Sequence, residues 1–203
     1  MPYEITKTYP ADFPSVTTGK PDAQVLEVEI NASISSTTCI GIRIPNAQTG
    51  VLQFDVEPSA ADLTAIDNVC AAHTGESFAD GVQRDYTEAE QTVTSTTYQT
   101  MGGFQSGPLS GGDYLVTWYG EISVATADST SGCLARFLYG GVERAESSNA
   151  TSFYVSFSGS AIITVPALSR PILQMQLRRA GTTNTAKIRR IRIAMAPLHN
   201  GLS

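Results

Sequence analysis

The sequence has little charge. Only 16% of its 203 residues are Asp, Glu, Lys or Arg, and Ser, Thr, Gly and Ala are correspondingly frequent. A freely soluble monomer usually carries more surface charge than this. A polar but weakly charged surface is typical of a chain that packs against neighbouring proteins.

Cysteine is scarce as well. Cys39, Cys70 and Cys133 are odd in number, widely spaced and without a CxxC pair. This pattern argues against a disulfide framework and a cysteine-based zinc site. It predicts buried free thiols in a reducing compartment.

Long apolar runs and targeting signals are missing. No run approaches the roughly 20 apolar residues of a membrane helix. The first residues, MPYEITKTYP, have neither the basic nor the apolar part of a signal peptide. We therefore expect no membrane association, and we discount the two glycosylation-type triplets that begin at Asn31 and Asn149.

Residue types that carry catalysis are also sparse. The two histidines, His73 and His199, have no nucleophile signature nearby, and GxSxG is absent. The aspartates show no calcium-loop spacing, and the glycines around 102–112 form no phosphate loop. The sequence therefore predicts no enzyme, no catalytic residue, no cofactor and no metal site.

The charges that are present divide unevenly along the chain. Residues 1–111 carry 4 basic and 14 acidic side chains, a balance of −10, and residues 112–203 carry 9 and 5, a balance of +4. The two halves therefore have different electrostatic potentials, which suggests that they bind different partners. Chance acidity in a soluble module explains the same difference equally well.

Residues 1–78 are predicted to form an N-terminal arm and a small attachment domain. The Pro- and Thr-rich segment 1–24 indicates an extended arm that holds its own domain or a neighbour. Residues 25–34 are interpreted as a half-buried strand with an acidic outer face, and 39–44 with 51–56 as a hairpin.

One helix follows the hairpin. Ser59 is a candidate N-cap with Asp62 in the capping-box position, His73 lies in the last turn, and Gly75 follows it. The apolar residues at helical spacing predict one buried face, made of Leu63, Ile66, Val69 and Cys70. The first domain is thus small and α+β, with about three strands and one helix.

The second half has the alternation of β-strands. Residues 79–111 are predicted to be a linker or the first strand of the sandwich, with 92–100 as that strand and Gly102-Gly103 as loop. Residues 112–203 are predicted to form a β-sandwich domain. Gly140-Gly141 indicates a primed hairpin turn. About eight strands predict an antiparallel β-sandwich or jelly roll, so the chain is mainly β. Apolar alternation predicts the core side chains, among them Tyr114, Val116, Trp118, Ile122, Val124, Phe153, Val155, Phe157, Leu173, Met175, Leu177, Ile191, Ile193 and Met195.

A group of basic residues lies in the last part of the sequence. Ile188 is out of step with Ile191, and a bulge at Arg189-Arg190 would restore the alternation. Arg178, Arg190 and Arg192 are expected on adjacent antiparallel strands, as a patch for phosphate or a protein, or as an outward face that discourages edge pairing. Nucleic-acid binding is disfavoured, because interleaved aromatics are missing and the chain is acidic. A protein interface or a trimer contact is preferred.

The aromatic residues of the second half allow two interpretations. They form either a sugar-stacking platform or the core of the sandwich, and alternation favours the core. Tyr119 and Tyr154 lie on the opposite parity from their neighbours, so they are the best candidates for exposed binding residues.

The stretch from Val25 to Gly75 resembles an N-terminal module of tailed-bacteriophage virion proteins. The shared features are a strand ending in Phe54, the helix start Ser59–Asp62, and the closing Ala-Ala-His-Thr-Gly at 71–75. Residues 114–122, 153–165 and 187–195 carry a fold-level likeness to jelly rolls of the TNF and C1q type.

This resemblance implies a structural component of a phage particle, assembled in the host cytoplasm. The leading hypothesis is a capsid decoration or cement protein that binds the major capsid protein or another virion protein, with the jelly roll as a homotrimer. The alternative is a receptor- or glycan-binding module of a tail fibre, baseplate or head fibre, with Tyr119 and Tyr154 at a sugar site.

Overall fold

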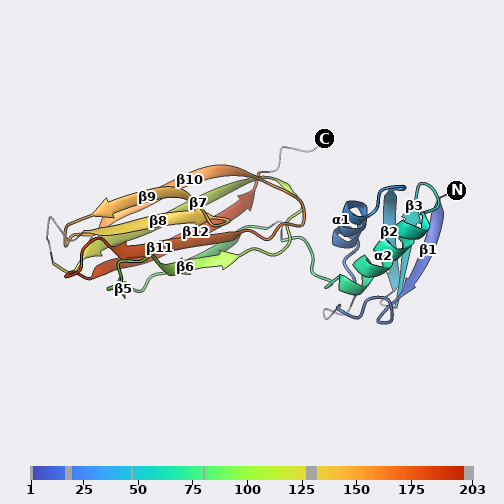
Figure 1. Cartoon of the computed structure of the whole chain (residues 1–203), viewed down its shortest axis with the longest axis horizontal. Helices are drawn as coiled ribbons and strands as arrows, with labels where there is room; N and C mark the ends of the chain where they lie inside the picture. The colour runs from blue at the N-terminus through green and yellow to red at the C-terminus, as the bar shows by residue number, and fades with distance from the viewer. Residues whose placement is uncertain (1, 17–19, 47, 80, 127–131, 199–203) are drawn as a thin grey trace. The chain divides into compact units, whose positions relative to one another are not determined.

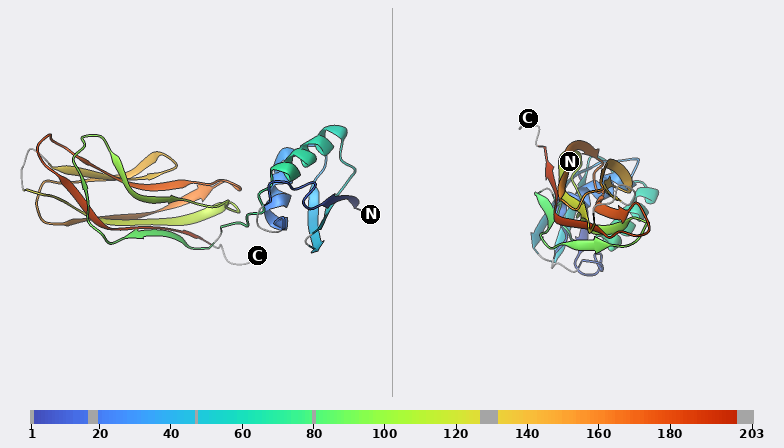
Figure 2. Two further views of the ribbon diagram at one scale, coloured as in Figure 1. Left: turned by 90° about the horizontal axis from the view of Figure 1, so that it is seen from below. Right: turned by 90° about the vertical axis from the view of Figure 1, so that its left-hand side faces the viewer.

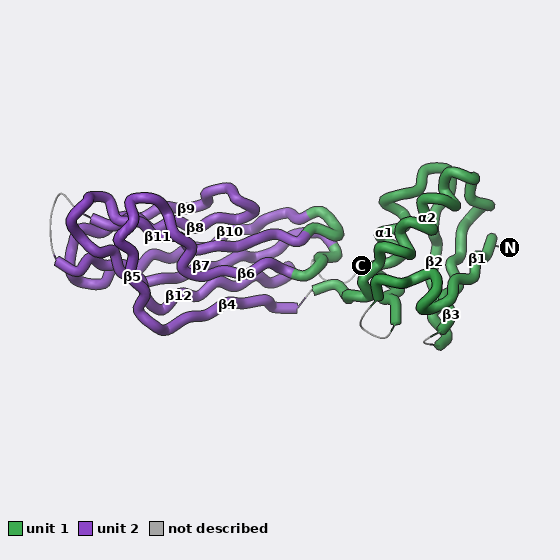
Figure 3. The backbone as a smooth tube through the Cα atoms, turned by 60° about the horizontal axis from the view of Figure 1, so that its bottom comes forward, with its two compact units in different colours: residues 1–79, 107–110, 166–169 green, residues 80–106, 111–165, 170–203 purple. Residues whose placement is uncertain are grey.

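The computed structural model describes residues 2–16, 20–46, 48–79, 81–126 and 132–198. These residues form two compact units (Figure 3). The first contains residues 1–79 with the short segments 107–110 and 166–169, and the second contains 80–106, 111–165 and 170–203. His199, one of the two histidines, lies outside the described residues.

The first unit is a three-stranded antiparallel sheet with two helices on one face (Figures 1 and 2). The sheet has the order β1-β3-β2. Its core includes Phe13, Leu26, Ile30, Leu52, Phe54 and Ile66, all almost completely buried. The elements in chain order are β1 (Tyr3–Thr8), α1 (Ala23–Ser33), β2 (Cys39–Asn46), β3 (Thr49–Phe54) and α2 (Ala60–Ala72).

The predicted N-terminal arm is partly a strand of this unit. β1 pairs antiparallel with β3, with Tyr3 opposite Phe54 and Thr8 opposite Thr49. The arm therefore holds its own domain, which is one of the two possibilities that its composition left open. The predicted hairpin is confirmed as β2 and β3.

Helix α2 begins where its capping signal predicts. The Ser59 hydroxyl accepts a hydrogen bond from the Asp62 amide at 3.2 Å. The Asp62 carboxylate in turn accepts backbone N–H bonds from Ser35 at 3.0 Å and Ser36 at 3.2 Å. One acidic side chain thus joins the start of α2 to the segment after α1. Beyond the helix, Gly75 has φ +76°, a conformation that favours glycine.

The predicted strand at 25–34 is wrong, because these residues lie in helix α1. The Asp22 carboxylate caps the helix by accepting from the amides of Gln24 at 3.1 Å and Val25 at 3.0 Å. Leu26 and Ile30, four residues apart, are both fully buried. A helix places Leu26 and Ile30 on one face, which packs against the sheet. The small domain therefore has two helices and not one.

The second unit is a β-sandwich of nine described strands in two antiparallel sheets that face each other (Figure 2). One sheet has the order β10-β7-β12-β4 with β5 also paired to β12, and the other has the order β6-β11-β8-β9. From β9 to β12 successive strands alternate between the sheets, as in a jelly roll. The strands are β4 (Gln83–Thr87), β5 (Gln91–Val93), β6 (Gln99–Gln105), β7 (Gly112–Val124), β8 (Cys133–Tyr139), β9 (Val142–Asn149), β10 (Val155–Val165), β11 (Ile172–Arg179) and β12 (Ala186–Pro197).

Most of the predicted sandwich core is confirmed. The inward residues of β7, β11 and β12 are buried, and Trp118 stacks on Phe137 of the opposite sheet with ring centroids 4.5 Å apart. The Gly140-Gly141 turn has φ +57° and +79°, as a primed turn requires. All three cysteines are free and buried. Burial raises the pKa of Cys70 to about 12 and that of Cys133 to about 11, so both stay thiols.

Three predictions for the second half need correction. Residues 79–111 contain β4, β5 and β6, so the segment is neither a linker nor one strand. Gly102-Gly103 lies within β6, where a Cβ on Gly103 would come 2.1 Å from the Leu173 carbonyl oxygen. Phe153 and Val155 are exposed, at 79% and 45%, because Phe153 lies in the bend before β10 and only Phe157 turns inward.

We predict that Gly159→Ala destabilises the sandwich. A Cβ at this position would lie 2.4 Å from Cζ2 of Trp118, which is already stacked on Phe137. Overpacking of this kind typically costs about 1–3 kcal/mol of the free energy of unfolding. Trp118 is the only tryptophan, so its fluorescence during urea unfolding reports the change directly. Ser158→Ala, on the exposed side of the same strand, is the control and should leave the midpoint unchanged.

Candidate functional site

The structure separates the arginines that the sequence analysis grouped together. Arg190 and Arg192 lie on β12, in the five-stranded sheet, whereas Arg178 lies on β11, in the four-stranded sheet. The prediction that they occupy adjacent paired strands is therefore wrong. Strands consecutive in the chain cross between the two sheets of the jelly roll at this point.

Arg178 belongs to a small cluster on the four-stranded sheet. Its guanidinium carbon lies 5.1 Å from the Tyr98 ring centroid, and that of Arg136 lies 3.9 Å from it. The Tyr98 hydroxyl donates to Glu146. Burial, followed by this hydrogen bond, raises the pKa of Tyr98.

The predicted bulge on β12 is confirmed. The register between β12 and β7 shifts between Arg189, opposite Glu121, and Arg192, opposite Tyr119. Arg190 takes φ +53°, in the left-handed region that non-glycine residues rarely adopt. The extra residue lets Arg189, Arg190 and Arg192 all carry their charges outside the core, while Ile188, Ile191 and Ile193 are buried.

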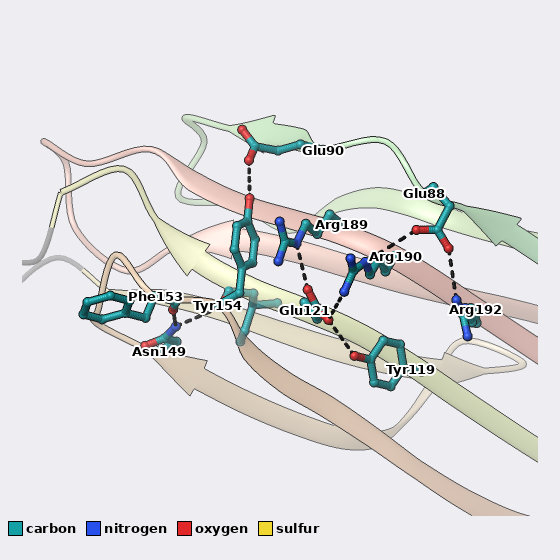
Figure 4. A network of polar contacts seen from close by, with 11 residues as sticks. Glu88, Glu90, Tyr119, Glu121, Asn149, Phe153, Tyr154, Arg189, Arg190 and Arg192 are labelled. Atoms are coloured by element: carbon teal, nitrogen blue, oxygen red, sulfur yellow. Dashed lines mark hydrogen bonds and ion pairs between the residues drawn. The ribbon is translucent and has the colours of Figure 1, made fainter.

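Glu121 on β7 binds both arginines of the bulge (Figure 4). Its Oε2 accepts from Nε of Arg189 at 2.7 Å, and its Oε1 accepts from Nη1 of Arg190 at 3.0 Å and from the Tyr119 hydroxyl at 2.8 Å. The glutamate is 8% exposed. Hydrogen bonds from Tyr119 first, and then from the arginines, lower the pKa of Glu121 to about 2.

Acidic side chains between β4 and β5 complete this arginine–glutamate network. Glu88 pairs with Arg190 at 3.5 Å and with Arg192 at 3.0 Å. Glu90 accepts from the Tyr154 hydroxyl and pairs with Lys187 at 3.2 Å, and these contacts, Tyr154 first, lower the pKa of Glu90. The basic side chains of β12 are therefore largely compensated by glutamates of β7 and of the segment between β4 and β5 (Figure 4).

Tyr119 and Tyr154 are less available than predicted. Both side chains are half-buried, and both hydroxyls donate to glutamates of the network. Tyr154 also lies under Arg189, whose guanidinium carbon is 3.8 Å from its ring centroid. Burial, with the bond to Glu90 next, raises the pKa of Tyr154. Tyr154 thus supports the network, whereas Tyr119 also borders an open cavity.

That cavity is a groove on the five-stranded sheet with a volume of about 730 Å³. Strand register places Tyr119, Arg192 and Tyr86 side by side on β7, β12 and β4, and the next row contains Thr117, Ala194 and Arg84. The Arg192 guanidinium carbon lies 5.7 Å from the ring centroid of Tyr86 and 5.9 Å from that of Tyr119. We call this surface the tyrosine groove; it is lined by Arg84, Tyr86, Thr117, Tyr119, Arg192 and Ala194, with Asp85, Trp118 and Ile193 also contributing.

Sequence reasoning missed Tyr86 and Arg84. Tyr86 is 60% exposed, more than either tyrosine that was predicted. The segment 79–111 has few large aliphatic residues, so its pattern does not predict the strand β4. The alternation of Arg84 and Tyr86 around Asp85 was the available signal.

His73 has a structural position. Its side chain is fully buried, Nδ1 lies 2.6 Å from Glu29 Oε2, and Nε2 accepts from the Asp22 amide at 3.1 Å. The ring thereby joins the end of α2 to the start of α1. Within the described ranges, no group of three or more His, Cys, Asp or Glu side chains could hold a metal ion. In the same part of the chain, no helix is long and apolar enough to cross a bilayer.

Comparison with known proteins gives likeness at the level of fold. No protein-family profile and no curated protein matches the chain. Solved structures that it resembles include the Eiger TNF from S. frugiperda, with 8% identity, a TM-score of 0.38, and 61% of this chain and 95% of that chain covered. The CBM22-1 xylan-binding domain of Paenibacillus barcinonensis Xyn10C has 12% identity, a TM-score of 0.29, and coverage of 61% and 90%.

A third resemblance is to the insecticidal delta-endotoxin Cry8Ea1 from Bacillus thuringiensis. It has 14% identity and a TM-score of 0.37, and it covers 81% of this chain. The chain spans only 30% of the length of that toxin. At these identities and TM-scores the likenesses identify no function for this chain.

We predict that Glu121→Gln destabilises the sandwich and changes how its free energy of unfolding falls at acid pH. At pH 7 the variant should lose about 2 kcal/mol of the free energy of unfolding, because the two arginines lose a shared anion. The carboxylate of Glu121 stabilises the fold above its ordinary pKa of 4.5, and this contribution falls away as the pH drops towards about 2.

The measurement is urea unfolding by Trp118 fluorescence from pH 7 to pH 2. Wild-type protein should lose more stability between pH 4.5 and 2 than Glu121→Gln does. Glu143→Gln removes an exposed ion pair to Arg136 at 3.4 Å on the other sheet, and should behave like wild type. If wild type and Glu121→Gln lost the same free energy of unfolding between pH 4.5 and 2, the role of Glu121 would be contradicted.

Proposed function

We propose that this chain is a non-enzymatic binding protein whose sandwich binds a carbohydrate in the tyrosine groove. The observation that carries the proposal is the row Tyr86–Arg192–Tyr119 across three strands of one sheet. An open groove of about 730 Å³, with aromatic walls and a few convergent polar groups, matches a site for a small ligand or a short oligomer.

The aromatic side chains favour a sugar over a purely polar ligand. A tyrosine ring offers an apolar face to the C–H side of a pyranose, and its hydroxyl remains hydrogen-bonded. Tyr119 is fixed through Glu121, so its ring is held without a ligand. Such preorganisation lowers the entropy cost of binding. Tyr86 is exposed on the opposite side of Arg192, where a second contact can form.

The chemistry of the groove is that of binding. Asp85 is the one carboxylate among its lining residues, and its oxygens accept from the backbone amides of Tyr86 at 2.9 Å and Gly103 at 2.7 Å. These bonds engage both oxygens and hold the carboxylate towards β6. A general acid or base needs a free proton-transfer position at the substrate, which supports a non-catalytic role.

We predict that Tyr86→Ala weakens carbohydrate binding while the protein stays folded. The ring is exposed, so its removal should leave the free energy of unfolding within about 0.5 kcal/mol of wild type. A glycan array identifies the bound class, and calorimetry measures the affinity, which should fall at least about tenfold. Phe153→Ala, which removes a 79% exposed ring outside the groove, is the control and should bind normally. Equal losses for both variants would refute the assignment of the groove.

The second candidate is a virion structural protein, in particular a capsid decoration protein that binds the major capsid lattice. It is supported by the phage-like motif from Ser59 to Gly75, which builds the capped helix of the first unit. The unequal charge of the two halves also fits a division between attachment and display. On this proposal the sandwich is a homotrimer, and the protein resides in the particle after assembly in the host cytoplasm.

We predict for this candidate that purified chain binds capsids that lack it and raises their resistance to heat. Stabilisation follows from mass action, since a ligand of the assembled shell shifts it away from disassembly. Co-sedimentation and a thermal melt of the capsid measure both effects. If the purified protein binds glycans or host cells but does not sediment with capsids, the decoration role is eliminated. The receptor-binding alternative then remains.

A further inference from the structure

Of the two arginines of the tyrosine groove, only Arg192 is paired with a carboxylate among the described residues. Arg84 and Tyr86 share the outer side of β4, since residues two apart on a strand point the same way. Among the described residues Arg84 makes no ion pair, and its side chain is exposed. Asp85, between them, has its carboxylate bound to the Gly103 amide of β6.

Arg192 contributes the second guanidinium. Its Nη2 donates to Glu88 Oε1 at 3.0 Å, and Glu88 is shared with Arg190. Around the network four cations, Lys187, Arg189, Arg190 and Arg192, face three glutamates, Glu88, Glu90 and Glu121. Arg84 adds a further cation at the groove, and the one carboxylate that lines the groove, Asp85, is held towards β6. An anion is therefore favoured at this place on a chain whose net charge is −6.

The spacing suits a sugar that carries a carboxylate. Arg84 and Tyr86 are about 7 Å apart along the strand, and neighbouring strands are about 4.8 Å apart. A pyranose that stacks on Tyr86 therefore extends an exocyclic group towards Arg84. Opposite Arg84 stands Ala194, with Thr117 beyond it, so only small side chains occupy this row. A planar guanidinium binds a carboxylate through two parallel hydrogen bonds.

We infer that the groove selects acidic carbohydrates, that is, glycans with uronic or sialic acid residues. The inference rests on the proposed carbohydrate function and specifies its ligand. Tyr86 and Tyr119 supply the stacking surface, and Arg84 with Arg192 supplies the carboxylate contact. Neutral sugars retain the stacking contact alone and bind more weakly.

The test uses the full chain and two matched pairs of probes in calorimetry. One pair is tetragalacturonate and its carboxyl-reduced, neutral counterpart, and the other is sialyllactose and lactose. The acidic member of at least one pair should bind at least about tenfold more tightly, because charge-assisted hydrogen bonds are the stronger ones. Higher salt should narrow this difference. The two pairs also distinguish uronic from sialic acid.

Arg84→Gln is the decisive variant. It should reduce the preference for the acidic probe to about twofold and leave the affinity for the neutral probe unchanged. Arg144→Gln removes an exposed arginine of the other sheet and should retain the full preference. Because Arg84 is exposed, its replacement should not affect unfolding, and Trp118 fluorescence checks this.

Each outcome separates the inference from the proposed function. Acidic and neutral probes that bind equally, with loss of both in Tyr86→Ala, would overturn the inference and keep the carbohydrate function. Absence of binding to all four probes and to a glycan array would overturn both. A polyglutamate peptide that binds as tightly as tetragalacturonate would show a general anion site and overturn the selection of carbohydrate.

Discussion

One carboxylate, that of Glu121, holds the irregular part of β12 in place. A non-glycine residue in the left-handed region, as Arg190 is, costs about 1–2 kcal/mol. Arg189 and Arg190 would also repel each other on the same surface. Glu121 offsets both effects, because its two oxygens bind one guanidinium each and it is almost fully buried between them. The core depends on this contact, since the bulge is what turns Ile188, Ile191 and Ile193 inward together.

The same irregularity creates the groove. Between Arg189 and Arg192, β12 advances three residues while β7 advances two, from Glu121 to Tyr119. Without the extra residue Arg192 would point into the sandwich, because one step of register reverses the faces of a strand. With it, Arg192 stands between Tyr119 and Tyr86, and Ala194 follows on the outer side. Packing and recognition therefore share one structural cause, and a change in the bulge affects both.

Sequence patterns predicted the structure correctly where neighbouring residues alone determine it. The parity of Ile188 against Ile191 required a bulge, and Ser59 with Asp62 required a helix start; both are present. They failed where tertiary contacts decide: the stretch around Leu26 and Ile30 suits a strand or a helix, and burial against the small sheet selects the helix. Arg178 was misplaced because alternation does not show which strands pair, and consecutive strands are usually neighbours. Tyr86 was missed because β4 is short and poor in aliphatic residues.

The distribution of charge limits how an anionic ligand can be recognised. The chain is acidic overall, and glutamates neutralise most of the arginines on β12, so the field at long range does not attract anions. At physiological salt, charges separated by more than about 8 Å are largely screened in any case. The groove must then recognise an anionic ligand at contact distance, through hydrogen bonds from a guanidinium that lies beside a tyrosine ring. An acidic sugar should therefore gain its affinity chiefly through slow dissociation, whereas its association should be no faster than that of the neutral sugar.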